Sequence, residues 1–275
     1  MAAQAYTLAP DVVVLEREPG MVQCGMDATR VGVLEAHPQL AGVLNRLRIP
    51  LTRQTIENLI ARTGLSPAAA RSLVEDLISY NILWPEPRLQ RIAVLGNSVL
   101  ADELRDALMS DHFQPRTPLH TESAADYIDN VAGYLPIVAV DMLGGAVEWA
   151  QALQRSKATW LPVSMLDARG IIGPARVNGA GPCPMCAHLH RIDADAQWHE
   201  VAQRADAAVR PGDPVVRTAV VMHAVVTIRR LMGRPSPPGA PTARPLAGEL
   251  KEIDLYGMEQ HRFVLEHPRC PYCSG

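Results

Sequence analysis

Four of the five cysteines in this chain form two Cys-x-x-Cys pairs. Cys183 and Cys186 lie within GPCPMC, and Cys270 and Cys273 lie within RCPYC. A Cys-x-x-Cys turn places two sulfur atoms on the same side of a tight loop. Two such turns supply the four thiolates that Zn²⁺ prefers in a structural site. Because four thiolates leave no open position for water, the sequence predicts a structural zinc ion and not a catalytic one.

Three other kinds of cysteine site compete with this interpretation. Disulfide bonds need an oxidising compartment, yet the chain opens on MAAQAYTLAPDVVV, without the basic segment and apolar run of a secretory signal. A thioredoxin-like redox pair should open a helix after a strand, whereas both pairs lie among prolines. A mixed metal site would use His188, His190 or His267, which are near the right spacing. The four-cysteine zinc site is the preferred prediction, because a metal would pin a chain end that otherwise frays.

The composition bounds the classes of function. At 275 residues the chain is long for one core and sufficient for two domains. Its formal net charge is −3, so no overall positive field attracts nucleic acid or anionic lipid. No apolar run is long enough to span a bilayer. We therefore expect a cytoplasmic protein that binds neither nucleic acid nor a membrane. The fifth cysteine, Cys24, is expected to be buried in a strand.

Residues 1–86 predict a small winged-helix-like (α+β) domain. A three-stranded sheet comes first and amphipathic helices follow, with Thr52 and Ser66-Pro67 as helix starts and Gly64 in the turn between two helices. The expected strands are 11–18, 21–28 and 30–36, and the expected helices are 37–47, 53–64 and 68–82. Pro85-Glu86-Pro87 closes this domain as a linker.

Residues 90–275 predict a larger α/β domain that contains the cysteine pairs. Strands alternate with helices from a strand–turn–helix unit at 91–110, through apolar runs at 135–143 and 159–166. This alternation predicts a Rossmann-like, doubly wound, mostly parallel sheet. The later segments are two helices at 191–209 and 213–232, a Pro/Gly-rich crossover loop at 233–248, and two antiparallel strands around 256–260.

The turn at the start of this second domain resembles a degraded nucleotide site. A strand, a glycine turn and a helix can cradle phosphate at the helix N-terminus. Here Gly96 keeps the first place of a G-x-G-x-x-G pattern, but Ser98 and Ala101 stand at the later places. Asp141, after the next apolar run, could bind Mg²⁺ or a ribose, or could simply form a turn. The chain has only two lysines and no Gly-x-x-x-x-Gly-Lys-Ser/Thr loop, so ATP binding is not expected.

The order of these features resembles the ThiF/MoeB branch of ubiquitin-activating-type enzymes, which hold a four-cysteine zinc site in this arrangement. More narrowly, GPCPMCAHLHRIDADAQW is similar to the GPCxxCxxLHRxDxDxxW signature of partner proteins of YcaO cyclodehydratases, which make thiazole- and oxazole-modified peptides. The matching residues are Cys183, Cys186, Leu189, His190, Arg191, Asp193, Asp195 and Trp198. The family's N-terminal leader-recognition domain, similar to PqqD, corresponds to residues 1–86.

The resemblance implies a non-catalytic adaptor that works as a homodimer. Such partner proteins have lost adenylation and leave ATP chemistry to the YcaO protein, so Gly96 and Asp141 would be remnants of a nucleotide site. The chain would bind a precursor leader peptide as an added strand on the sheet edge at 30–36. Val31, Val33, Leu73 and Leu77 would line that groove, unless they are simply core residues.

Three other functions stay open at this point. One is an ATP-dependent adenylating enzyme, in which the Gly96 turn and Asp141 still work. A second is a DNA-binding regulator, although the helix that carries Arg71 also carries Glu75 and Asp76 and so lacks a basic face. A third is a scaffold for a partner that does not modify peptides. A helix cap and a solvated helix face explain His190 and Arg191 equally well.

Overall fold

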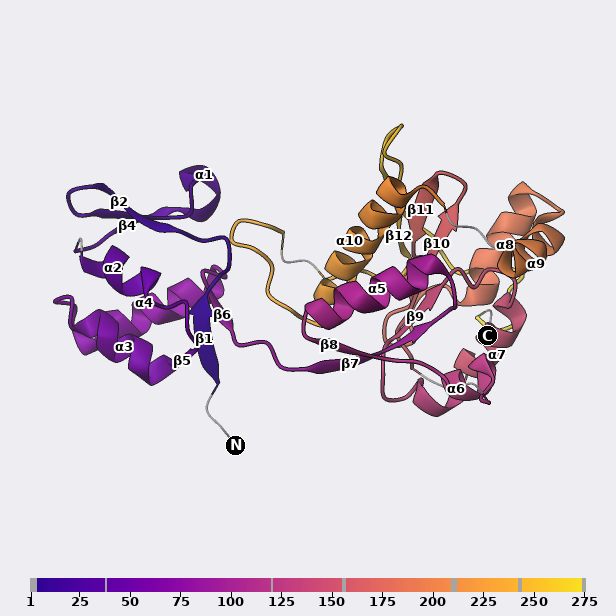
Figure 1. The fold of residues 1–275 in the computed structure, drawn as a ribbon, viewed down its shortest axis with the longest axis horizontal. Helices are drawn as coiled ribbons and strands as arrows, with labels where there is room; N and C mark the ends of the chain where they lie inside the picture. The colour runs from indigo at the N-terminus through magenta and orange to yellow at the C-terminus, as the bar shows by residue number, and fades with distance from the viewer. Residues whose placement is uncertain are drawn as a thin grey trace. The chain divides into compact units, whose positions relative to one another are not determined.

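The computed structural model describes residues 4–37, 39–119, 121–154, 157–208, 212–241 and 244–273, and Figure 1 draws it as a ribbon. The chain divides into two compact units. The first comprises Met1–Arg88 with Met232–Ala243, and the second comprises Leu89–Leu231 with Arg244–Gly275. Within the described ranges, no helix is both long enough and apolar enough to cross a membrane.

One of two small sheets in the first unit consists of β2 (Val14–Glu18), β3 (Met21–Cys24) and β4 (Val33–Glu35), with β3 in the middle and all pairs antiparallel. The expected strands are longer than the observed ones, because α1 (Ala28–Val31) lies between β3 and β4. The Asp27 side chain accepts a hydrogen bond from the Thr29 N–H and so caps this short helix. The cap ends the extended conformation that the sequence predicts through residue 28.

The other small sheet has β1 (Ala5–Leu8) between β5 (Leu51–Thr52) and β6 (Leu83–Pro85). The sequence pattern predicts no strand at this place. The four residues of β1 are too few to show a period, and its two partners are distant in the chain. Only the folded unit brings these short segments together.

Three helices cover these sheets: α2 (Gln39–Asn45), α3 (Arg53–Ala61) and α4 (Pro67–Ser79). The predicted starts are confirmed, since the Thr52 and Ser66 hydroxyls accept hydrogen bonds from the N–H groups of Thr55 and Ala69. Leucine, isoleucine and valine side chains of all three helices meet those of the strands in one core. Cys24 is buried in β3, as expected, and burial raises its pKa to about 11.

The second unit contains a seven-stranded mixed sheet in which one half is parallel. β8, β7, β9 and β10 are neighbours in that order, so the first strand of the unit lies between the second and the third. Every residue of β9 is buried, as in strands covered on both faces. The elements of this half are β7 (Gln90–Leu95), α5 (Val99–Ser110), β8 (Phe113–Arg116), α6 (Ala124–Val131), β9 (Ile137–Val140), α7 (Ala146–Gln154) and β10 (Trp160–Leu166).

The other half of the sheet is antiparallel, so the expectation of a mostly parallel sheet is wrong. β10 is followed in space by β11 (Arg169–Ile172), β12 (Glu249–Ile253) and β13 (Gln260–Phe263). Only two residues link β10 to β11, and Asp167 among them has a φ of 54°. A link of this length forms a hairpin, because a parallel connection needs a crossover of a dozen or more residues.

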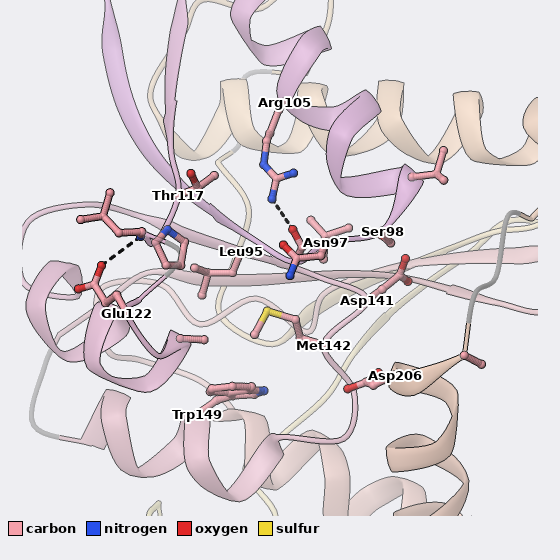
Figure 2. Close-up of a pocket in the computed structure, with 17 residues that line it drawn as sticks. Leu95, Asn97, Ser98, Arg105, Thr117, Glu122, Asp141, Met142, Trp149 and Asp206 are labelled. Atoms are coloured by element: carbon pink, nitrogen blue, oxygen red, sulfur yellow. Dashed lines mark hydrogen bonds between the residues drawn. The ribbon is translucent and has the colours of Figure 1, made fainter.

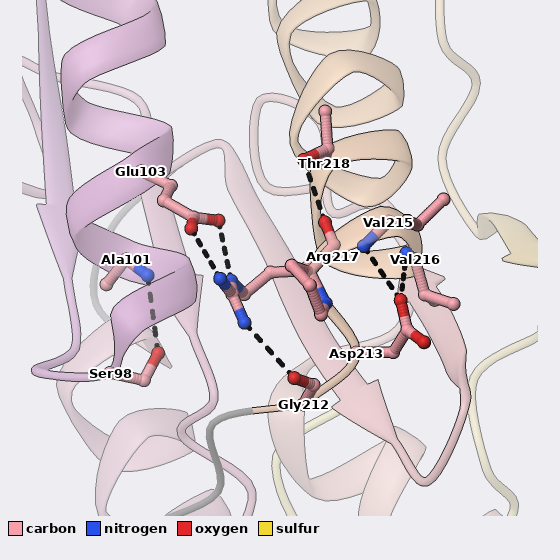
Figure 3. A network of polar contacts seen from close by, with 10 residues as sticks. Ser98, Ala101, Glu103, Gly212, Asp213, Val215, Val216, Arg217 and Thr218 are labelled. Atoms are coloured by element: carbon pink, nitrogen blue, oxygen red, sulfur yellow. Dashed lines mark hydrogen bonds and ion pairs between the residues drawn. The ribbon is translucent and has the colours of Figure 1, made fainter.

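Helices pack on both faces of this sheet. α10 (Pro214–Leu231) packs on α5 and on β11, where a Cβ at Gly170 would lie 2.0 Å from the Val220 side chain. Arg217 of α10 holds both carboxylate oxygens of Glu103 of α5, each at 2.7 Å (Figure 3). On the opposite face α7 packs on α6 and on α8 (Pro184–Ala194). The two faces therefore present different environments to a ligand.

The long helix expected at 191–209 is two helices instead. α8 ends at Ala194, and α9 (Trp198–Ala207) begins after three intervening residues. The Asp195 side chain accepts a hydrogen bond from the Gln197 N–H, and its carbonyl accepts one from the Trp198 N–H. An aspartate that bonds its own backbone two residues on forms a turn, and this turn ends α8.

Candidate functional site

The four paired cysteines meet in the second unit. Cys183 is the N-cap of α8, and Cys186 lies in the first turn of that helix. Cys270 and Cys273 belong to the turns near the end of the chain. The four sulfur atoms all lie within 4.8 Å of one another, and three of the four residues are buried. Two turns that are distant in sequence thus form one compact cluster of thiols.

The spacing of the sulfur atoms is compatible with a metal ion. The Cys183 sulfur lies 3.8 Å from that of Cys186 and 3.5 Å from that of Cys270. Tetrahedral zinc with Zn–S bonds of about 2.3 Å places its sulfur ligands about 3.8 Å apart, whereas a disulfide bond is about 2.05 Å long. The cysteines are therefore free thiols in an arrangement that could hold a metal ion.

The cluster also favours ionisation of one thiol. The Cys183 thiol donates to the Cys186 sulfur, which lowers the pKa of Cys186 to about 4 and raises that of Cys183. Burial raises the pKa of Cys270. A bound cation would compensate the charge of further thiolates, as it does in sulfur-ligated metal sites.

The histidines considered for a mixed site have other partners. His188 Nε2 lies 3.2 Å from His199 Nδ1, and His190 Nε2 lies 3.0 Å from the Leu265 carbonyl. His267 Nε2 lies 2.8 Å from the carboxylate of Asp193, which Arg269 also contacts. His190, Asp193 and His267 thus tie α8 to the segment that carries Cys270. Within the described ranges, the candidate metal ligands are the four cysteines.

A crevice of about 910 Å³ lies at the carboxyl ends of β7, β8 and β9, where α/β sheets often bind nucleotides. Gly96 and Asp141, the two predicted remnants of a nucleotide site, both line it. Figure 2 shows this crevice with Arg105 on one side and Asp206 on the other. The structure thus brings these two residues together at one crevice, while their part in a nucleotide site stays a prediction.

The glycine turn in the crevice is occupied by groups of the chain itself. A Cβ at Gly96 would lie 2.2 Å from the Val140 carbonyl, so this glycine permits β7 and β9 to approach each other. The Ser98 hydroxyl accepts a hydrogen bond from the Ala101 N–H at 3.3 Å and caps α5. The Arg105 guanidinium donates to the Gly96 carbonyl (Figure 2). It also pairs with Asp102 at 2.7 Å.

Most of the charged side chains in the crevice lining are carboxylates. Asp141 Oδ1 accepts a hydrogen bond from the Met165 N–H at 2.9 Å, and so joins the ends of β9 and β10. The two oxygens of Asp206 accept from the N–H groups of Leu143 and Gly144, at 3.1 and 2.7 Å. With Glu122, three acidic side chains face one arginine in the lining. This balance disfavours a triphosphate, because like charges repel it.

The four residues predicted to contact a peptide lie in three elements of the first unit. Val31 ends α1, Val33 begins β4, and Leu73 and Leu77 belong to α4. The first three are partly buried, whereas Leu77 is 1% exposed and belongs to the core. The strand edge that the sequence places at 30–36 is shorter than expected, since β4 contains only residues 33–35. Val31 thus lies on a helix and not on the strand.

β4 is nevertheless an edge strand. The Ala36 N–H donates to the Gly20 carbonyl, and in an antiparallel ladder every second residue bonds the neighbouring strand in this way. The backbone groups of Leu34 therefore also face β3. Those of Val33 and Glu35 face outward. The opposite edge of this sheet is already covered, because the Asn45 side chain bonds both the N–H and the carbonyl of Val14.

A second cavity, which we call the α8 cavity, escaped the sequence analysis. It has a volume of about 560 Å³ and lies between α7, α8 and the strands β10 to β13. Arg191 of α8 lines it and lies 5.0 Å from the ring centre of Trp198. A signal was present in the sequence: Pro184, Ala187, His188, Arg191, Ala194 and Trp198 follow the spacing of one helical face.

No protein-family model matches the chain, and no curated protein matches its sequence. Solved structures share its fold. A heterocyclase in complex with substrate and cofactor has a TM-score of 0.64 at 17% identity, over 98% of this chain and 40% of its own. The heterocyclase TruD has a TM-score of 0.59 at 17% identity, over 98% and 43%. The microcin C7 biosynthetic enzyme MccB in complex with N-formylated MccA has a TM-score of 0.55 at 10% identity. This match covers 98% of this chain and 99% of the MccB chain. The chain therefore spans about two fifths of the heterocyclases and the whole length of MccB.

Proposed function

We propose that this chain is a non-catalytic adaptor in the biosynthesis of azoline- and azole-containing peptides. It binds the leader segment of a precursor peptide and presents it to a YcaO-type cyclodehydratase. The observation that carries this proposal is the likeness in fold to heterocyclases, which covers 98% of this chain and 40% of the heterocyclase. An adaptor that works with a separate cyclodehydratase protein accounts for a match to part of a heterocyclase.

In this proposal the leader peptide adds a strand to the outer edge of β4. The outward N–H and carbonyl groups of Val33 and Glu35 would form the main-chain hydrogen bonds of such a strand. Val31 and Leu73 are partly buried and would contact peptide side chains, and Leu77 would support α4 from the core. The first unit is then the PqqD-like, winged-helix recognition domain of the family that the sequence resembles.

The second unit has the role of a scaffold of the ThiF/MoeB type with a Rossmann-like sheet. The four cysteines would hold a structural zinc ion, which fits their sulfur chemistry and their spacing. Such an ion compensates the charge of the thiolates when bound, and it leaves no ligand position for a substrate. The homodimer that the resemblance implies is part of the same proposal.

An ATP-dependent adenylating enzyme is the second candidate. The position of the crevice at the carboxyl ends of parallel strands favours it. The contents of the crevice oppose it, since Arg105 donates to the Gly96 carbonyl and Asp206 bonds the loop amides after β9. A DNA-binding regulator receives no support, because Glu75 and Asp76 accompany Arg71 on the exposed side of α4.

The decisive experiment is reconstitution. The chain, the YcaO protein encoded nearest to it and the Cys/Ser/Thr-rich peptide encoded beside them are purified separately and incubated with Mg²⁺ and ATP. Mass spectrometry should detect loss of one water per ring only when the chain is present. A full-rate reaction without the chain would overturn the adaptor role.

The peptide edge is tested by a matched pair of proline variants. Val33→Pro removes an outward N–H of β4 without removing a bond to β3, so leader affinity measured by fluorescence anisotropy should fall about tenfold or more. Glu16→Pro is the control on the opposite edge of the sheet, where Val14 already bonds Asn45, and it should retain affinity. Equal affinities in both variants would place the leader elsewhere.

A further inference from the structure

The α8 cavity has the size of a small-molecule site. Its volume of about 560 Å³ falls within the range of roughly 300 to 1,000 Å³ typical of ligand pockets. Three tryptophans, Trp149, Trp160 and Trp198, contribute to its walls. Aromatic walls of this kind bind an apolar or aromatic body, because flat rings bury a large area at little entropic cost.

The cavity exists because β10 presents different side chains to its two faces. Leu161 and Val163 are fully buried and alternate with Pro162, Ser164 and Leu166, which line the cavity. On the facing helix, small side chains at Ala187 and Ala194 leave room that larger ones would fill. The sheet face under α8 is thus less completely packed than the face under α10.

Cationic side chains line one part of the cavity, and among the described residues no carboxylate belongs to its lining. Arg191 has no ion pair among the described residues and rests against Trp198. Glu252 is the nearby carboxylate, and it is shared by Arg169 at 2.5 Å and Arg262 at 3.9 Å. Burial lowers the pKa of Arg191, and the charge of Arg262 lowers it further. One carboxylate for three guanidinium groups leaves a surplus of positive charge.

Two polar groups of the cavity-lining residues also lack a partner. His188 is 5% exposed, and its Nδ1 is buried without a hydrogen bond among the described residues. The indole N–H of Trp149, which lines both this cavity and the crevice, is in the same state. Because buried polar groups are nearly always hydrogen-bonded, such groups at the wall of a cavity can bond a ligand or an ordered water.

We propose that the α8 cavity binds a small aromatic carboxylate, whose carboxylate pairs with Arg191 and Arg262 and whose ring lies among the three tryptophans. The planar guanidinium fork matches a carboxylate with two parallel hydrogen bonds. A phosphate would need more donors than these mostly apolar walls offer. This inference goes beyond the adaptor role and is independent of it, since it concerns a different unit from the β4 edge.

The test uses the full chain and two probes that differ in one group, phenylpropionate and its uncharged amide. A Trp84→Phe background leaves Trp149, Trp160 and Trp198 as the only tryptophans, and all three line the cavity. Tryptophan emission should change saturably with phenylpropionate, and the carboxylate should bind about tenfold or more tightly than the amide. Calorimetry on the unmodified chain measures the same ratio.

Two arginine variants and one control locate the site. Arg191→Gln and Arg262→Gln should each reduce the preference for the carboxylate to within about threefold. Arg204→Gln removes an exposed arginine of α9 that pairs with Glu200 outside the cavity, and it should leave the preference unchanged. Equal affinity for acid and amide, no saturable change, or a preference that survives both arginine variants would overturn the proposal. If an arginine variant fails to fold, the comparison of the two probes on the parent chain still decides.

Discussion

The crevice and the α8 cavity differ in how their polar groups are satisfied, although Arg105 Nε in the crevice lining and the Trp149 indole N–H, which belongs to both linings, are buried without a partner among the described residues. In the crevice the Ser98 hydroxyl caps α5, Arg105 donates to the Gly96 carbonyl, and Asp206 accepts from two loop amides. In the α8 cavity His188 Nδ1 has no partner in the described part of the chain, and Arg191 has no ion pair there. Volume and position alone therefore do not identify the better ligand site, because they do not measure unmet hydrogen bonds.

The two linings also differ in charge. Glu122, Asp141 and Asp206 outnumber Arg105 in the crevice, whereas the α8 cavity contains Arg191 and Arg262 and no carboxylate. Both cavities belong to the second unit. One fold therefore combines an acidic crevice, whose side chains bond the chain's own backbone groups, with a cationic cavity. The variants below are designed to alter one of the two without the other.

The largest expected effect comes from loss of the metal, which should act on the α8 cavity first. Cys183 begins α8, so Cys183→Ser or a strong chelator should release about one equivalent of metal and destabilise the second unit by on the order of 5 kcal/mol or more. Phenylpropionate binding should disappear, while the first unit stays protected in limited proteolysis. Metal content, proteolysis and calorimetry measure the three results.

Cys24→Ala is the matched control for this prediction. Cys24 is buried in β3 of the first unit and lies outside the four-cysteine cluster, so its removal should leave the metal content unchanged. Less than about half an equivalent of metal in the parent protein would contradict a structural metal site. So would full retention of metal by Cys183→Ser.

The next effect concerns the reason for a glycine in the crevice. Gly96→Ala should destabilise the second unit by about 2–4 kcal/mol, because the new Cβ would meet the Val140 carbonyl and because Gly96 has a φ of 111°. Gly133→Ala, where a Cβ would meet no atom within 4 Å, should change stability by less than about 0.5 kcal/mol. Urea unfolding measures both. If Gly96→Ala left the free energy of unfolding unchanged, the turn would be able to adjust to a side chain at this position. A phosphate-binding turn that is not held by contact with β9 would behave in this way.

A smaller effect is expected for Asp206, the carboxylate of the crevice that accepts hydrogen bonds from two loop amides. Asp206→Ala leaves the N–H groups of Leu143 and Gly144 without their acceptor and should cost about 1 kcal/mol, since the site is partly solvated. Glu200→Ala, on the same helix, removes an exposed ion pair with Arg204 and should cost less than about 0.5 kcal/mol. The same urea unfolding series compares the two variants. Equal losses of unfolding free energy would show that the hydrogen bonds of Asp206 do not stabilise the crevice.

The sequence predicts best what depends on local pattern. The Thr52 and Ser66 caps, the burial of Cys24 and the meeting of the four cysteines all follow from residue type and spacing. The alternation of strands and helices likewise predicts an α/β fold, and β7, α5, β9 and β10 lie at the expected places. Each of these features is determined by a few neighbouring residues or by a specific chemistry.

The remaining features depend on contacts between distant residues. β1 pairs with two short strands from elsewhere in the chain. The antiparallel half of the large sheet begins at the two-residue link between β10 and β11, which reverses the direction of the next strand. Arg105 and Asp206 each bond backbone groups, and no residue pattern marks these contacts. The α8 cavity needs both a helical face and the strands beneath it. Sequence alone therefore singled out two residues of the crevice without their bonding partners, and it did not predict the α8 cavity.

The smallest expected effect is that of ATP on the parent chain. A site with a Kd of about 10 μM would stabilise the fold by about 2.7 kcal/mol at about 1 mM ligand, which thermal unfolding detects readily. We expect no shift with MgATP, because Arg105, Ser98 and Asp206 already bond backbone groups that line or adjoin the crevice. A clear shift would instead support the adenylating enzyme. Asp206→Ala then separates occupancy from shape: if MgATP stabilises this variant alone, the carboxylate excludes the nucleotide, and if it stabilises neither, the closed turn at Gly96 does.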